Sequence, residues 1–214
     1  MRMFLWSLLA VCPLYAQSPS IVISEIMWMG SSLSSADEWV ELYNAGDSTQ
    51  ALDGWTLTRL TSLGEEAMLT IEQGMIRPGE TFLIANYAAD HANSRLATVP
   101  DLVDASLSLP NSKLQLALYN GSPEFGGQLI DIADDGKGAP LAGDSAQKRS
   151  MERIDIWGDG RMESSWHTAE TAYGWDPDSP EMGTPGLVPS HINPPTPMRP
   201  TAIQSTNWAT IKAQ

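Results

Sequence analysis

The sequence predicts an all-β protein in which two mainly antiparallel sheets pack as a sandwich. Two observations between residues 20 and 170 favour this class. The apolar segments there are short and rich in β-branched or aromatic residues, with glycine, asparagine, aspartate and proline between them. Helical periodicity is nearly absent. In addition, a chain of 214 residues can bury one sizeable core without help from disulfides or a metal ion.

Eight segments have the composition and length of strands, which is enough for two packed sheets. In chain order they are 21–27, 38–43, 55–60, 68–71, 81–86, 113–119, 128–132 and 148–155. Within the sixth segment, Leu114, Leu116 and Leu118 alternate with other residues, so these leucines are expected to face the core. Residues 88–112 lack such alternation and are expected to form a loop with a helical turn.

Residues typical of turns lie between the predicted strands. They occur at 44–47, 52–54, 77–79, 120–121 and 135–136, where glycine can supply the positive φ that other residues resist. The pair Asn120 and Gly121 is the strongest hairpin signal among them.

The charge balance limits the choice of partners. The chain has 12 basic and 26 acidic residues and a formal charge of -14. The resulting negative potential repels phosphate groups. We therefore expect no nucleic-acid partner.

Residues 1–16 have the pattern of a secretory signal peptide, with Arg2 ahead of an apolar stretch and Ala16 at the expected cleavage position. A secreted or cell-surface product is expected. A buried first element and lipidation of Cys12 are the alternatives, although Val11 occupies a place where lipidation requires a small residue. Cleavage would remove the only cysteine, which precludes a disulfide, and no later stretch reaches the roughly 20 apolar residues of a membrane span.

The domain is expected to cover residues 17–187. Beyond it, prolines at 189, 194, 195, 197 and 200 predict an extended linker within the segment 188–214. The last residues of this segment could dock on a protein or could form a frayed terminus.

Three blocks of sequence carry a family resemblance. They read IVISEIMWMG at 21–30, DEWVELYN at 37–44 and LDGWTL at 52–57. In these blocks and their spacing the chain resembles the lamin tail domain family, over about residues 20–187. Later segments that agree with the family are 76–84, 150–153, 165–166 and 183–186.

The resemblance implies an immunoglobulin-like β-sandwich with no catalytic role, in a bacterial-type secreted member that serves as a binding or cell-surface structural module. It implies no cofactor, and its partner would be an extracellular protein or a cell-surface glycan. The alternative is an accessory or targeting module for an extracellular nuclease or phosphatase. The residues of the structural signature are Glu25, Trp28, Trp39, Glu41, Leu42, Asn44, Trp55 and Trp166.

Glu25 and Glu41 lie mid-strand, where carboxylates are disfavoured. We expect each to accept hydrogen bonds from backbone or indole donors near the sheet ends. A catalytic acid and base pair is the alternative. Around Glu41, Val40 and Leu42 are expected to point inward, whereas the residues that alternate with them point to the other face.

Histidines and acidic loops are the remaining candidates for chemistry. His91, His167 and His191 are too isolated for a zinc site, and a dyad of His167 with Glu170 would lack an activated nucleophile. The loops 131–136 and 155–160, which include Asp131 to Asp135 and Asp155 to Asp159, partly match a calcium loop. Ala133 and Trp157 replace the third ligand, and Ala142 and Trp166 stand at the twelfth position, so both loops fail as EF-hand loops. Solvated turns are expected, and a calcium site of another kind is the alternative.

Tryptophan is abundant for this length, with 8 in the chain. Most are expected to cap the ends of the core. Trp157, Trp166 and Trp175 lie in loop-rich sequence and are candidates for stacking on sugars or filling a protein interface.

Overall fold

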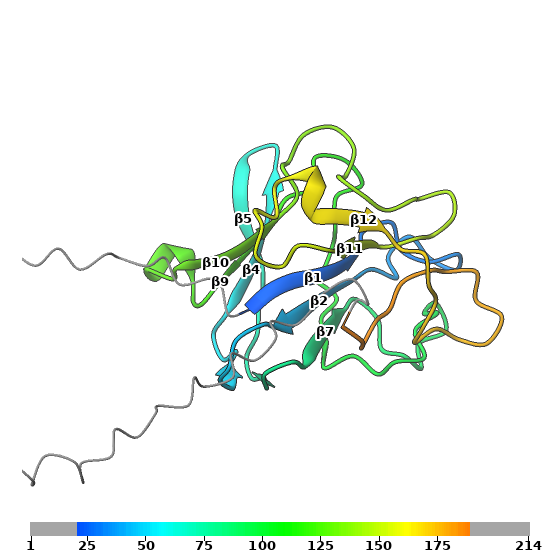
Figure 1. The fold of residues 1–214 in the computed structure, drawn as a ribbon, viewed down its shortest axis with the longest axis horizontal. Helices are drawn as coiled ribbons and strands as arrows, with labels where there is room; N and C mark the ends of the chain where they lie inside the picture. Colours follow the sequence, from blue (N-terminus) through cyan, green and yellow to red (C-terminus); the bar gives the residue numbers. More distant parts are fainter. Residues whose placement is uncertain (1–20, 189–214) are drawn as a thin grey trace, which may run out of the picture.

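The structure is a computed structural model that describes residues 21–188, and it confirms the all-β sandwich (Figure 1). Its larger sheet has six strands, which follow one another from β12 to β7 down the drawing. In sheet order they are β12 (Trp166–Thr168), β11 (Met151–Arg153), β1 (Ile21–Met27), β2 (Trp39–Asn44), β7 (Thr81–Ala85) and β8 (Leu102–Val103).

The second sheet has four strands, and a small third sheet has two. The four are β10 (Leu129–Ala133), β9 (Leu116–Tyr119), β4 (Thr56–Thr61) and β5 (Gly64–Thr70), and the two are β3 (Gln50–Ala51) and β6 (Met75–Ile76). Neighbouring strands are antiparallel except for β7 and β8, which are parallel. Two short 3-10 helices, η1 (Pro123–Phe125) and η2 (Glu163–Ser165), complete the described elements.

The core lies between the two large sheets. Leu114, Leu116 and Leu118 are fully buried in it, which confirms their predicted inward orientation. From the larger sheet Ile23 and Ile26 join the same cluster, although they are three positions apart. A β-bulge at Ser24 explains this spacing, because it adds one residue to β1 opposite β2.

Both faces of the two central strands β1 and β2 are buried. On β2, Val40 and Leu42 belong to the main core as predicted. The opposite face carries Trp39, Glu41 and Tyr43 and was expected to point away from the core. These side chains are nevertheless buried, with exposed fractions of 0 to 3%. The loops after β11 and β12 cover this outer face, and sequence alternation could not reveal a cover that comes from distant residues.

Several predicted boundaries differ from the structure for local reasons. The segment 113–119 forms a strand only from Leu116, because Lys113 has a left-handed φ of 54°. β5 begins at Gly64, four residues before the prediction, since its first half is polar and exposed. β3, β6, β8 and β12 were missed, as two or three residues are too few for an alternating pattern.

Two loop predictions also need correction. Strands β9 and β10 do form a hairpin, but the Asn120 N–H donates to the Gln128 carbonyl across a longer loop that contains η1. Gly126, with a φ of 93°, takes the left-handed conformation there. In 88–112 the structure has hydrogen-bonded turns and strand β8 in place of a helical turn.

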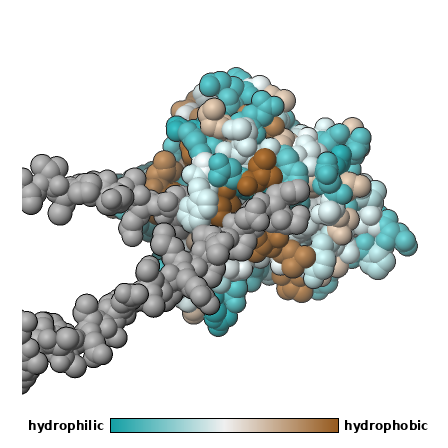
Figure 2. Space-filling view, viewed as in Figure 1, coloured by the Kyte–Doolittle hydropathy of each residue, from teal (hydrophilic) through white to brown (hydrophobic). Residues whose placement is uncertain are grey.

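The visible surface is mainly hydrophilic, and its hydrophobic residues form small separate areas (Figure 2). Leu63 and Phe125 are among the most exposed apolar side chains; Leu63 lies at a turn, and Phe125 is the last residue of η1. Within residues 21–188, no helix has the length and apolar character to cross a bilayer. The predicted signal peptide, Cys12, His191 and the segment after residue 188 lie outside the described residues.

Candidate functional site

Four ionisable side chains form a row across the larger sheet. Glu25 on β1 is paired with Glu41 on β2 and with Glu152 on β11, and Glu152 is paired with His167 on β12. The three glutamates are 0 to 2% exposed. The sequence singled out Glu25 and Glu41, but strand register was needed to add Glu152 and His167 to the same row.

The segment 183–186 closes over this row and supplies its hydrogen bonds. The Thr184 N–H donates to Glu25 Oε1 at 2.9 Å, and the Gly186 N–H donates to Glu41 Oε2 at 2.7 Å. The hydroxyl of Ser150 donates to Glu25 Oε1 at 2.5 Å. Backbone donors were expected for these glutamates, but they come from a distant segment, and hydroxyl groups take the place of the expected indoles.

Burial and mutual repulsion favour the protonated forms of Glu25 and Glu41. Burial, reinforced by the charge of Glu152, raises the pKa of Glu25 to about 8. Burial and the neighbouring Glu25 also raise the pKa of Glu41 well above its usual value. The Thr184 hydroxyl lies 2.8 Å from Glu25 Oε2 and 3.3 Å from Glu152 Oε1, so it can relay a hydrogen bond between the two carboxyls. This arrangement fixes the 183–186 segment to the sheet, and a substrate could reach the carboxyls only by displacing that segment.

Asn44 anchors the turn after β2, as its position predicted. Its Nδ2 donates to the carbonyls of Ser48 and Ile76, both at 2.9 Å, and its Oδ1 accepts from the Gly46 N–H at 2.9 Å. The residue is fully buried. It therefore joins the turn to β6 through a single side chain.

We expect Asn44→Ala to lower the free energy of unfolding by about 1–3 kcal/mol, because it leaves the buried carbonyl of Ile76 without that donor. Urea unfolding followed by tryptophan fluorescence measures the change. Asn111→Ala, at an exposed turn position, is the matched control and should change stability by less than about 0.5 kcal/mol. Equal stability of the two variants would contradict the role of Asn44.

The other signature residues have structural positions. Leu42 lies in the core, as do Trp28, Trp39 and Trp55, whose exposed fractions are 6% or less. The Trp28 Nε1–H donates to the Ala142 carbonyl at 3.0 Å. The Trp39 ring contacts that of Trp175, with centroids 5.9 Å apart.

Of the three candidates for an exposed indole, Trp166 is instead buried, in line with the expectation that most tryptophans belong to the core. Its side chain is 4% exposed because its Nε1–H donates to the Gly160 carbonyl at 2.8 Å and the Arg153 guanidinium lies over its ring. Trp175 is half-buried and donates to the Gly183 carbonyl at 3.1 Å. Trp157, at 46%, is the most exposed of the three.

The carboxylates of the two acidic loops hold local structure. Asp131 is buried and forms an ion pair with Arg153 at 3.4 Å, and Asp134 accepts from the N–H groups of two loop residues. Asp155 likewise accepts two backbone N–H groups. Hydrogen bonds and charge from Arg161 lower the pKa of the Asp159 carboxyl to about 2. Between residues 21 and 188, no three His, Cys, Asp or Glu side chains are arranged to hold a metal ion.

His167 and His91 contact neighbours that the sequence did not predict. His167 Nε2 lies 2.7 Å from Glu152 Oε2, so its acidic partner is Glu152, not Glu170. His91 stacks on Tyr87 with ring centroids 4.2 Å apart, and its Nδ1 accepts from the Asn93 N–H.

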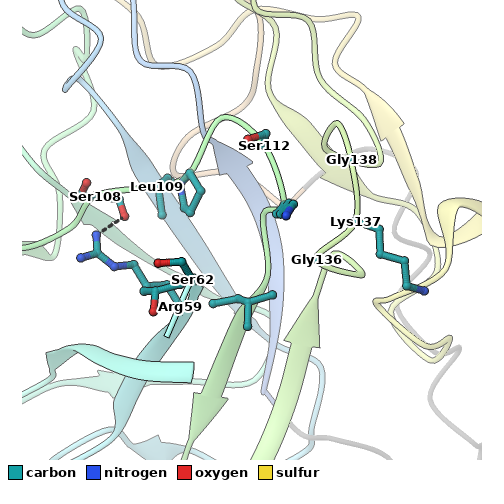
Figure 3. A pocket seen from close by; sticks show the side chains of 12 residues that line it. Arg59, Ser62, Ser108, Leu109, Ser112, Gly136, Lys137 and Gly138 are labelled. Carbon is teal, nitrogen blue, oxygen red and sulfur yellow. Dashed lines mark hydrogen bonds between the residues drawn. The ribbon is translucent and has the colours of Figure 1, made fainter. Parts of the chain in front are cut away.

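A pocket of about 780 Å³ opens to solvent where three segments meet (Figure 3). These are the end of β4 with its turn, the loop at 108–113 and the loop at 136–138. Arg59 and Ser62 lie on one side of the pocket, and Gly136 to Gly138 lie on the other. Its lining comprises Arg59, Leu60, Thr61, Ser62, Ser108, Leu109, Pro110, Ser112, Lys113, Gly136, Lys137 and Gly138.

Hydrogen bonds fix the walls of this pocket. Arg59 Nη1 donates to the Ser108 carbonyl at 2.9 Å, and the Lys113 N–H donates to the Gly138 carbonyl at 2.7 Å. The Leu109 N–H donates to the buried carboxyl of Glu38 at 2.9 Å, and burial raises the pKa of Glu38 to about 7. Each loop is thus tied to a neighbouring segment before any ligand arrives.

No pattern in the sequence predicts this pocket. Its basic residues are far apart in the sequence, and only the fold brings their loops together. A usable signal was present, because in an acidic chain Lys113 and Lys137 follow serine and glycine within short turns. Without the sheet register, that signal could not show that both lysines border one pocket.

Comparison with known proteins adds a family match. The sequence model described as Lamin Tail Domain matches residues 15–136. No curated protein matches the chain. A solved structure similar to this chain is that of a DUF4876 family protein from Bacteroides thetaiotaomicron, with a TM-score of 0.41 and 13% identity, over 80% of this chain and 72% of the other.

Proposed function

Because this chain belongs to the lamin tail domain family, we propose that it is a secreted, bacterial-type, non-catalytic module that binds a cell-surface saccharide. Export is supported by Arg2, the apolar stretch after it and Ala16. A non-catalytic role is supported by Glu25 and Glu41, because these buried side chains bind a segment of their own chain.

The pocket bordered by Arg59, Ser62 and Gly138 is the observation that carries the binding role. Its volume of about 780 Å³ lies within the range of about 300–1,000 Å³ that is typical of small-ligand sites. A stable protein partner would instead cover a broad area of about 800 Å² on this chain. Hydroxyl, guanidinium and backbone groups in the lining can form hydrogen bonds with sugar hydroxyls, and Leu60, Leu109 and Pro110 add apolar contact.

Retention on immobilised polysaccharide from the envelope of the producing cell tests this proposal. The full exported chain should be retained. Ser62→Trp should abolish retention, because Ser62 is an exposed lining residue and an indole at this position fills the pocket. Leu63→Trp is the matched control, since Leu63 is 97% exposed, adjacent in the same turn and outside the lining.

Two outcomes would count against the proposal. If the wild-type chain is not retained, the saccharide-binding role is wrong. If Ser62→Trp and wild type are retained equally, the pocket is not the binding site.

A further inference from the structure

We propose that the pocket bordered by Arg59 and Lys113 binds an oxyanion, a carboxylate, sulfate or phosphate group, carried by the saccharide. This inference rests on the proposed function and specifies the chemistry of its ligand. The first observation is the charge of the lining, which includes Arg59, Lys113 and Lys137 and no acidic residue. That composition is unusual in a chain with 26 acidic and only 12 basic side chains.

Two other surface pockets show that the charge of this lining is specific to its location. Glu65, Glu66 and Glu124 line a pocket of about 510 Å³ near β5 and η1. Glu72, Asp101 and Asp104 line one of about 310 Å³. Both linings are acidic, as expected for the chain as a whole, whereas the lining at Arg59 is basic, although Arg59 pairs with Glu66 and Lys137 pairs with Asp135 outside that lining.

Arg59 keeps donors available for a ligand. A guanidinium group has five N–H bonds. In Arg59, Nε donates to Glu66 Oε1 at 3.0 Å, Nη2 lies 3.0 Å from the same oxygen as an ion pair, and Nη1 donates to the Ser108 carbonyl. Two N–H bonds remain, and the three existing contacts hold the guanidinium at the pocket wall (Figure 3). Such a fixed, forked donor suits a planar or tetrahedral oxyanion.

Lys113 is held in a backbone conformation that a lysine rarely adopts. Its φ is 54°, in the left-handed region where asparagine and glycine are at lower cost. Its side chain is exposed, and no carboxylate among residues 21–188 pairs with it. Its unpaired cation at the pocket wall is the feature that supports a binding role, because the left-handed φ alone also occurs at Lys148, outside the pocket.

Lys137 has a peripheral role in this arrangement. Its Nζ lies 3.6 Å from Asp135 Oδ2, and its side chain points away from Arg59 (Figure 3). The exposed hydroxyls of Ser62 and Ser112 supply neutral donors at the rim. Arg59 and Lys113 are therefore the residues expected to bind the oxyanion directly.

The net charge of the chain does not prevent anion binding here. The formal charge of -14 is spread over the whole molecule. At physiological ionic strength, interactions between exposed charges are largely screened beyond about 8 Å. An anion in the pocket therefore interacts mainly with the groups nearest to it. Among the basic ones, Arg59 and Lys137 each have an acidic partner, whereas Lys113 has none among residues 21–188.

Titration with glucuronate, glucose 6-sulfate and glucose 6-phosphate, followed by the amide NMR signals of the full chain, tests the inference. At least one of these probes should bind and shift the signals of Lys113 and Gly138, whereas neutral glucose should bind about tenfold or more weakly. The three probes distinguish carboxylate, sulfate and phosphate as the recognised group. Raising the salt concentration from about 0.01 M to about 1 M should weaken the binding.

Lys113→Asn separates a binding role from a structural one. It should weaken binding of the charged probe about tenfold while leaving stability equal or higher, since asparagine tolerates the left-handed φ. Lys148→Asn is the matched control, because Lys148 has a φ of 55° and lies outside the pocket lining. Arg59→Gln should weaken binding further.

The inference is overturned if none of the charged probes binds, if glucose binds as tightly as they do, or if Lys113→Asn binds like wild type. In each case, retention of the chain on envelope polysaccharide would show that the proposed function itself still holds. Loss of that retention as well would show that both have failed.

Discussion

Arg153→Met is expected to lower the free energy of unfolding by about 3–5 kcal/mol, because it removes one partner of a buried ion pair. Arg153 is fully buried, and its Nη1 lies 3.4 Å from the carboxylate of Asp131. The same side chain donates to the carbonyls of Asp155 and Gly158 at 2.9 and 2.8 Å. Methionine fills much of the volume but leaves a buried carboxylate and two carbonyls without a cation.

The partner substitution provides the internal check on this prediction. Asp131 also accepts from the Ile23 N–H at 2.8 Å, so Asp131→Asn keeps an oxygen that can accept from that donor while it removes the charge. In the Arg153→Met background, Asp131→Asn should therefore restore part of the lost stability. The four chains of this double-mutant cycle can be compared by urea unfolding.

Arg161→Met is the matched control for the same chemical change at the surface. Arg161 pairs with Asp159 at 2.7 Å, and both side chains are about half exposed. Exposed ion pairs contribute about 0–1 kcal/mol. If Arg153→Met were no more destabilising than Arg161→Met, the buried pair would have no special role in holding β11 against β10.

The free energy of unfolding is expected to fall as the pH rises from about 5 to about 8. In the folded chain the pKa is about 8 for Glu25 and about 7 for Glu38, against 4.5 for an unperturbed glutamate. Between these values the folded state binds more protons than the unfolded state. The contribution of these two carboxyls to the free energy of unfolding is thus fully present below about pH 4.5, and it is lost as the pH rises through their pKa values in the folded state.

The size of this effect follows from the same linkage. Each such carboxyl contributes a slope of up to about 1.4 kcal/mol per pH unit between its two pKa values. The groups that face Glu25 are Glu41, Glu152 and, beyond Glu152, His167. Burial also raises the pKa of Glu41, which reinforces the trend. Asp159, with its pKa lowered to about 2, acts in the opposite direction only under more acidic conditions.

Glu25→Gln isolates the contribution of one carboxyl. Glutamine can accept from the Ser150 hydroxyl and the Thr184 N–H at its oxygen, and its amide nitrogen can donate to the Thr184 hydroxyl, which in the wild type donates to Glu25 Oε2. The variant should be more stable than wild type at pH 8 and should show a smaller slope in urea unfolding between about pH 5 and 8. Glu124→Gln, at an exposed position, is the control. A wild-type stability that rises over this range, or parallel curves for wild type and Glu25→Gln, would contradict the prediction.

Local pattern was sufficient for several parts of the fold. The predicted bounds of β1 match the structure, since a short segment rich in β-branched residues ends at a turn. Alternation of apolar residues identified the buried leucines, which lie in β9 and in the loop before it. Turn chemistry identified the bend at Asn44. These features depend on neighbours within a few residues, so a single sequence contains the information that they require.

The residues of the candidate site could not be grouped from local pattern, because their contacts join positions far apart in the sequence. Glu25 contacts Thr184, which is 159 positions away, and Lys113 meets Gly138 across two loops. A one-residue change of register would move either glutamate to the opposite face of the sheet. No local pattern predicts the strand register, the bulge at Ser24 or the path of the 183–186 segment.

By itself, the sequence determined the all-β class, the family and most strands, because the period of apolar residues and the chemistry of turns act over short distances. Only the tertiary structure decided that Glu25, Glu41 and Glu152 share one buried row and that Arg59 and Lys113 share one pocket. The physical reason is that burial, pKa and local potential depend on which distant groups are brought together, and strand register and loop closure determine those neighbours.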